Sequence, residues 1–128
     1  MSRATLFADG GSRGNPGPAA SGAVLFGEDG TVLAEVGLYL GVATNNVAEW
    51  RALIIGIERA RELGIEEITI RMDSELVVRQ VTGVYRVKSA DLIPLASQAK
   101  AMLTPSRCLY LLGDHGVLVR RDPPGTEY

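Results

Sequence analysis

The stretch Asp9-Gly-Gly-Ser-Arg-Gly-Asn-Pro-Gly-Pro18 interrupts the first apolar part of the chain and sets the order of the elements around it. Residues 3–9 predict a strand that stops at Gly10-Gly11, and residues 21–27 predict a second strand. The glycines and prolines between them predict a turn-rich loop from Gly10 to Pro18, because such residues disfavour regular backbone structure.

The next signal is Glu28-Asp29-Gly30, whose Asp-Gly pair is typical of a tight hairpin. It leads to a third predicted strand over residues 31–40, in which apolar side chains recur at alternate positions. The chain is therefore expected to open with three antiparallel strands.

The rest of the pattern alternates helical and extended segments. It predicts a helix that begins near Asn45-Asn46 and ends at Gly64, a strand over 65–72, helices over 74–82 and 89–104, and a last strand over 107–112. A strand that is reached through a helix runs parallel to an earlier strand. The order predicts a single α/β domain over residues 1–128, with helices packed on a mixed five-stranded sheet, three antiparallel strands and then parallel strands. Residues 113–128 form an atypical tail, since Pro123-Pro124 prevents a final helix.

The composition is that of an ordinary globular protein and leaves the partner open. Of the 128 residues, 46% are hydrophobic and 22% are charged, and a net charge of −2 neither requires nor excludes a nucleic-acid partner. The single cysteine, Cys108, excludes an internal disulfide and favours a reducing cytoplasm. We expect no secretion signal and no membrane partner, because no apolar run approaches the length of a membrane span.

Three acidic residues occupy places where strands and helices meet. Asp9 ends the first predicted strand, Asp73 follows the fourth, and Glu49 lies in the first turn of the long helix. If the first and fourth strands are parallel neighbours, Asp9 and Asp73 reach the same edge of the sheet, where ligands of α/β proteins bind. Carboxylates that are brought together need protons or cations, and their hard oxygen atoms suit Mg²⁺ or Mn²⁺.

Each acidic residue also has a local explanation. Glu49 could form a capping box with Asn46, Asp73 could cap the helix that follows it, and Asp9 could be a turn residue before Gly10-Gly11. These explanations need three separate coincidences, whereas one metal site explains all three residues together. Trp50, next to Glu49, could belong to the core or to a substrate groove.

Three segments resemble the first three signature segments of type 1 ribonucleases H. They are Asp9-Gly-Gly-Ser-Arg-Gly-Asn-Pro-Gly-Pro18, Thr44-Asn-Asn-Val-Ala-Glu49 and Met72-Asp-Ser-Glu-Leu-Val-Val78, in the family's order within residues 4–103. The resemblance implies an endonuclease that hydrolyses the RNA strand of RNA–DNA hybrids with two Mg²⁺ or Mn²⁺ ions and leaves 5′-phosphate ends. We expect the chain to be a monomer. It implies that Asp9, Glu49 and Asp73 are three of the family's four metal-binding, catalytic carboxylates. It also implies that the hybrid's backbone lies near Gly10, Gly11, Ser12, Asn15, Thr44 and Asn45.

The chain departs from the family pattern at its C-terminal end. The Ala-Asp pair that normally supplies the fourth carboxylate is missing, which leaves Asp122 as the best positional candidate and Asp114 as the alternative. His115 lies where many family members carry a mobile catalytic histidine, but it could equally be an exposed loop residue. Residues 82–92 resemble the short family form, without the basic, Trp-rich insertion.

Two other functions are compatible with these features. Integrases, transposases and junction resolvases share the fold but usually carry extra DNA-binding regions. A hybrid-binding module that cuts weakly or not at all would explain the unusual tail. The effect of a metal chelator separates the binding module from an enzyme. A pure binding module retains its affinity for the hybrid when the metal is removed, whereas an enzyme loses turnover.

Overall fold

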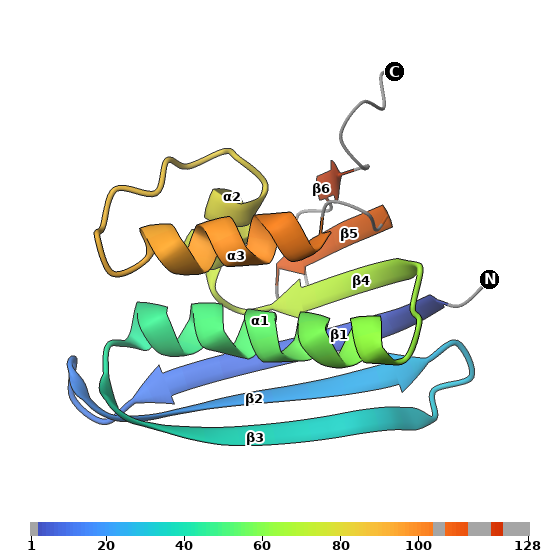
Figure 1. Cartoon of the computed structure of the whole chain (residues 1–128), viewed down its shortest axis with the longest axis horizontal. Coiled ribbons are helices and arrows are strands. Elements are labelled where there is room, and N and C mark those ends of the chain that lie inside the picture. The colour runs from blue at the N-terminus through green and yellow to red at the C-terminus, as the bar shows by residue number, and fades with distance from the viewer. Residues whose placement is uncertain (1–2, 104–106, 113–118, 122–128) are drawn as a thin grey trace.

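The fold was analysed in a computed structural model, which describes residues 3–103, 107–112 and 119–121 (Figure 1). The described residues form nine elements, in this order: β1 (Arg3–Ser12), β2 (Gly17–Gly27), β3 (Val32–Ala43), α1 (Asn45–Glu62), β4 (Glu67–Met72), α2 (Glu75–Val81), α3 (Ile93–Leu103), β5 (Arg107–Leu112) and β6 (Val119–Arg121). The predicted order of strands and helices is confirmed as far as β5. No helix in the described ranges is both long and apolar enough to cross a membrane.

The strands form one mixed sheet in the order β3-β2-β1-β4-β5-β6. The pairs β1–β4 and β4–β5 are parallel, and the pairs β1–β2, β2–β3 and β5–β6 are antiparallel. The prediction of five strands was wrong by one, because β6 adds a sixth strand beside β5. A strand of three residues is too short to show the alternation that reveals longer strands in a sequence.

The first two strands are longer than predicted, and the loop between them is shorter. β1 continues through Gly10 and Gly11 to Ser12, and β2 begins at Gly17, so that only residues 13–16 connect them. Pairing extends to Gly11 opposite Ala20 and Ser12 opposite Ala19. Glycine lowers strand propensity but does not forbid a strand, and here its missing side chain permits close packing. The third strand, predicted over 31–40, likewise runs from Val32 to Ala43.

The predicted hairpin at Asp29-Gly30 is confirmed. The Gly27 N–H donates to the Thr31 carbonyl at 2.8 Å, and Gly30 has a φ of +83°. Positive φ is a conformation that glycine adopts without steric cost, so the Asp-Gly signal was physically specific here.

The three helices bury one face of the sheet. α1 packs on β1 and β2, and α3 lies beside α1 (Figure 1). Gly56 allows this contact, because a Cβ at Gly56 would overlap the side chain of Leu6. α3 begins at Ile93 instead of the predicted 89, because Ser89 closes a turn by accepting hydrogen bonds from the N–H groups of Leu92 and Ile93.

Candidate active site

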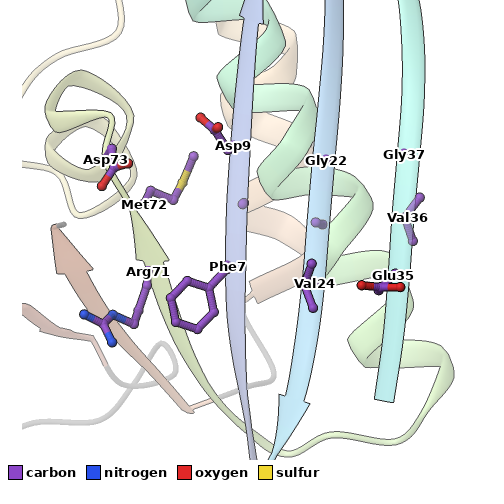
Figure 2. Close-up of a pocket in the computed structure, with 12 residues that line it drawn as sticks. Phe7, Asp9, Gly22, Val24, Glu35, Val36, Gly37, Arg71, Met72 and Asp73 are labelled. Carbon is purple, nitrogen blue, oxygen red and sulfur yellow. The ribbon is translucent and has the colours of Figure 1, made fainter. Parts of the chain in front are cut away.

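Asp9 lies in β1, and Asp73 directly follows the neighbouring strand β4 at the same level. β1 and β4 are parallel, with Phe7 opposite Arg71, and each aspartate follows two residues later in its chain. Both line a cavity of about 590 Å³ on the sheet face opposite α1, together with Phe7, Gly22, Glu35 and Arg71 (Figure 2). The expectation that the first and fourth strands are parallel neighbours is confirmed, and Asp9 and Asp73 line one cavity, although β1 does not end at Asp9. Asp9 is not a turn residue, since it lies within β1 and pairs with Gly22.

Glu49 is held from the opposite side of β1. The helix that carries it begins at Asn45, and the N-cap is Thr44, whose hydroxyl oxygen accepts from the Val47 N–H at 3.2 Å. The capping-box explanation with Asn46 was therefore wrong, because Glu49 lies two positions too far into the helix. Its Oε1 instead accepts a hydrogen bond from the Gly10 N–H at 2.8 Å.

The carboxyl group of Glu49 is in an unfavourable place for a negative charge. The residue is 9% exposed, and its Oε2 is buried without a hydrogen-bond partner. Burial raises the pKa of Glu49 to about 7, the Gly10 N–H opposes that rise, and the nearby Asp9 and Asp73 carboxylates add to it. A proton shared with Asp9, or a cation, would relieve the unpartnered oxygen.

Asp73 does not cap the helix that follows it. That role belongs to Ser74, whose Oγ accepts from the Val77 N–H at 3.3 Å. Asp73 is exposed and faces the cavity, as Figure 2 shows. Its carboxylate is thus available for a ligand.

The three carboxylates are neighbours, yet they do not enclose a single point. Asp9 and Asp73 both act on Glu49 through their charge, and the effect of Asp9 is the larger. Among the residues that the structure describes, no three Asp, Glu, His or Cys side chains are arranged as the ligands of one metal ion. Asp114, His115 and Asp122 lie outside the described residues.

The residues expected near the hybrid's backbone form a hydrogen-bonded group beside α1. Oδ1 of Asn45 accepts from the Ser12 N–H at 2.7 Å and from the Ser12 hydroxyl at 3.1 Å. The Asn45 N–H donates to Oδ1 of Asn15 at 3.1 Å. The structure therefore brings Ser12, Asn15 and Asn45 together, while Gly10 contacts Glu49, Thr44 caps α1 and Gly11 is exposed.

Two buried polar residues near the site were not predicted. The Ser21 hydroxyl donates to the Ala48 carbonyl at 2.6 Å, and Gln80 accepts from the indole N–H of Trp50 at 3.2 Å. Ser21 stands at a buried position of a strand with alternating exposure, which was the signal available in the sequence. Gln80 gave no such signal in its short helix.

The sheet order and the carboxylates at its edge define a ribonuclease H-like protein, and comparisons agree. The model of the family described as "Reverse transcriptase-like" matches residues 7–107. The bifunctional protein Rv2228c of Mycobacterium tuberculosis is 51% identical over 106 residues, which are 82% of this chain and 29% of that protein. Ribonuclease HI of Halobacterium salinarum is 46% identical over 102 residues, which are 80% of this chain and 51% of that protein. The chain thus spans about a third to a half of the length of these curated relatives.

Solved structures give the same assignment. The N-terminal RNase H domain of Rv2228c has a TM-score of 0.84 at 49% identity, with 86% of each chain covered. LC11-RNase H1 in complex with an RNA/DNA hybrid has a TM-score of 0.80 at 39% identity, with 85% of this chain and 83% of that chain covered. The chain belongs to the type 1 ribonuclease H family.

Proposed function

We propose that this chain is an endonuclease that hydrolyses the RNA strand of RNA–DNA hybrids, uses two divalent ions, Mg²⁺ or Mn²⁺, and leaves 5′-phosphate ends. The observation that carries the proposal is the buried, unpartnered Oε2 of Glu49 beside Asp9, with Asp73 directly after the adjacent strand β4. Family membership supports it, as does the similarity to an RNase H1 that was solved with an RNA/DNA hybrid. We further propose that the chain acts as a cytoplasmic monomer.

The residues fit divalent ions in their chemistry. Asp9, Glu49 and Asp73 offer carboxylate oxygens, the ligands that Mg²⁺ and Mn²⁺ prefer. A cation beside Glu49 would favour its ionised form, against the burial that raises its pKa. These three residues would hold the ions, and a fourth carboxylate from Asp122 or Asp114 would complete the set. When bound, two such ions supply an activated water and stabilise the leaving oxygen of a phosphodiester.

The remaining site residues would place the substrate. The group formed by Ser12, Asn15 and Asn45 lies beside the carboxylates and presents amide groups at the start of α1. Such groups bind a sugar–phosphate backbone without reading its bases. Contacts to 2′-hydroxyl groups across a shallow minor groove would select RNA, so we expect weak sequence preference.

One observation favours a second candidate, a hybrid-binding module with weak or no cleavage. In the part of the chain that the structure describes, the three carboxylates do not surround one point as metal ligands do. A protein that retained the substrate contacts but held ions poorly would bind hybrid and cut it slowly.

A substrate panel separates the two candidates. The purified chain is incubated with end-labelled RNA–DNA hybrid, single-stranded RNA or duplex DNA, each with Mg²⁺, Mn²⁺ or chelator. We expect metal-dependent cleavage that is confined to the RNA strand of the hybrid. Hybrid binding in chelator without cleavage in either metal would instead establish the binding module.

A further inference from the structure

A buried hydrogen bond joins the helix that carries Glu49 to the helix that follows Asp73. The indole Nε1–H of Trp50 donates to Oε1 of Gln80 at 3.2 Å. Trp50 is fully buried, and Gln80 is 5% exposed. Trp50 directly follows Glu49 in α1, while Gln80 lies in α2, which begins two residues after Asp73. The bond therefore links the backbone segments of two of the three carboxylates.

The helix α2 depends on such contacts for its orientation. It has only seven residues, and an isolated helix of that length is not stable in water. Its buried valines, Val77, Val78 and Val81, pack through apolar contact, which has no preferred direction. A hydrogen bond requires a particular distance and angle between its groups. The Trp50–Gln80 bond thus constrains how α2 is rotated and placed against α1.

The orientation of α2 bears directly on Asp73. This residue lies between β4, whose backbone is fixed by pairing with β1 and β5, and the Ser74 cap of α2. A rotation of α2 would therefore be taken up at the junction that contains Asp73. The Asp73 charge already acts on Glu49 across this gap.

We propose that Trp50 and Gln80 are positioning residues that set the placement of Asp73 relative to Glu49 for divalent-ion binding. The proposal rests on the proposed function, since it assumes that these carboxylates hold ions. Neither residue touches substrate. The pair acts through the backbone segments that it joins, and the full burial of Trp50 removes it from any substrate groove.

Three variants test the proposal: Trp50→Phe, Gln80→Leu and the double variant. Each single change leaves one buried polar group without its partner, whereas the double change removes both groups. If the pair only stabilises the fold, the double variant should be more stable than the single variants and should bind ions as tightly as the parent protein. If the pair positions Asp73, all three variants should bind ions more weakly than the parent protein. Ile57→Val on α1 is the matched control, because it removes one buried carbon and neither of the two polar groups.

The first measurement is the rise of the melting temperature with Mn²⁺ concentration, which needs no cleavage. We expect the half-saturating Mn²⁺ concentration to increase by about tenfold or more in all three variants, and not in Ile57→Val. Unchanged half-saturation would overturn the proposal, as would a parent protein that Mn²⁺ does not stabilise. If Trp50→Phe does not fold, Gln80→Leu alone decides the outcome. Circular dichroism shows whether it is folded, and the Mn²⁺ titration shows whether it binds ions more weakly.

The second measurement separates this proposal from the proposed function. With hybrid as substrate, kcat should fall by about 10- to 100-fold in the three variants, with KM nearly unchanged. A rise in KM at constant kcat would contradict a role in ion placement. A parent protein that binds Mn²⁺ but never cuts hybrid would refute the nuclease, while the Mn²⁺ titration would still decide the role of the pair.

Discussion

The Gly10 N–H donates to Oε1 of Glu49 at 2.8 Å, which ties the first strand to a helix that begins 35 residues later in the chain. The contact needs close approach, because a Cβ at residue 10 would overlap the Ala48 carbonyl. The glycine that resembled a loop signal in the sequence is thus a packing position that fixes Glu49 beside Asp9.

Replacing Gly10 should disturb both stability and the site. Gly10→Ala forces α1 away from β1, and overpacking of this kind costs about 1–3 kcal/mol of unfolding free energy. Urea unfolding followed by circular dichroism measures this cost. Gly37→Ala is the control, because a Cβ at Gly37 meets open space. Equal stability of the two variants would contradict the close-packing role of Gly10.

The buried Glu49 predicts a specific pH dependence in the metal-free protein. Its pKa of about 7 in the folded state exceeds the ordinary value of 4.5, so the folded state binds this proton more tightly than the unfolded state. The resulting stability is present below pH 4.5 and is lost as the pH rises to 7. The loss amounts to about 3 kcal/mol at most, from 1.36 kcal/mol for each unit of pKa.

Glu49→Gln should remove this dependence. In chelator at pH 8, we expect the variant to unfold at higher urea concentration than the parent, with the difference shrinking toward pH 4.5. Glu62→Gln, an exposed carboxylate at the end of the same helix, serves as control and should follow the parent. The buried-charge argument would be refuted if the unfolding free energy of the parent, relative to that of Glu49→Gln, did not fall between pH 4.5 and 7.

Ser21 should stabilise the turn of α1 that precedes Glu49. Its buried hydroxyl donates to the Ala48 carbonyl at 2.6 Å, and loss of a buried hydrogen bond costs about 1 kcal/mol. Thermal unfolding of Ser21→Ala should therefore show a lower melting temperature than the parent. Ser97→Ala, at an exposed position of α3, is the matched control. A melting temperature unchanged in both variants would show that the bond contributes nothing.

Asn45 should affect substrate binding more than turnover. Asn45→Ala removes the acceptor of the Ser12 N–H and hydroxyl groups at the end of β1, while the backbone N–H that donates to Asn15 remains. We expect KM for hybrid to rise by roughly tenfold while kcat changes little, because weakening the substrate contacts of this group by about 1.4 kcal/mol corresponds to that factor. Steady-state kinetics on labelled hybrid, with exposed Gln98→Ala as control, give both constants. A fall in kcat at constant KM would place Asn45 in the chemical step instead.

The sequence predicted that Asp9 and Asp73 belong to parallel neighbouring strands, because a strand reached through a helix runs parallel to an earlier one. It placed the end of the first strand at Asp9, whereas β1 continues to Ser12. It misjudged Gly10 and Gly11, since a glycine that permits close packing and a glycine that permits a turn look alike in one sequence. The helix start was also ambiguous, because Thr44, Asn45 and Asn46 are all good caps and only the fold selects Thr44.

Other features depend on contacts between distant segments. The bond between Trp50 and Gln80 joins residues 30 positions apart, and no local pattern marks either partner. The three-residue strand β6 exists because β5 offers it a pairing edge. Such relationships require the assembled sheet and helices.

The most direct test of the central claim compares the parent with Asp73→Asn and Glu62→Gln on a hybrid labelled in its RNA strand. Cleavage is measured in Mg²⁺, Mn²⁺ and chelator, and circular dichroism confirms that each protein is folded. We predict metal-dependent cleavage of the RNA strand by the parent and Glu62→Gln, and none by folded Asp73→Asn. Near-normal cleavage by Asp73→Asn, or parent cleavage that persists in chelator, would contradict a metal-dependent carboxylate site.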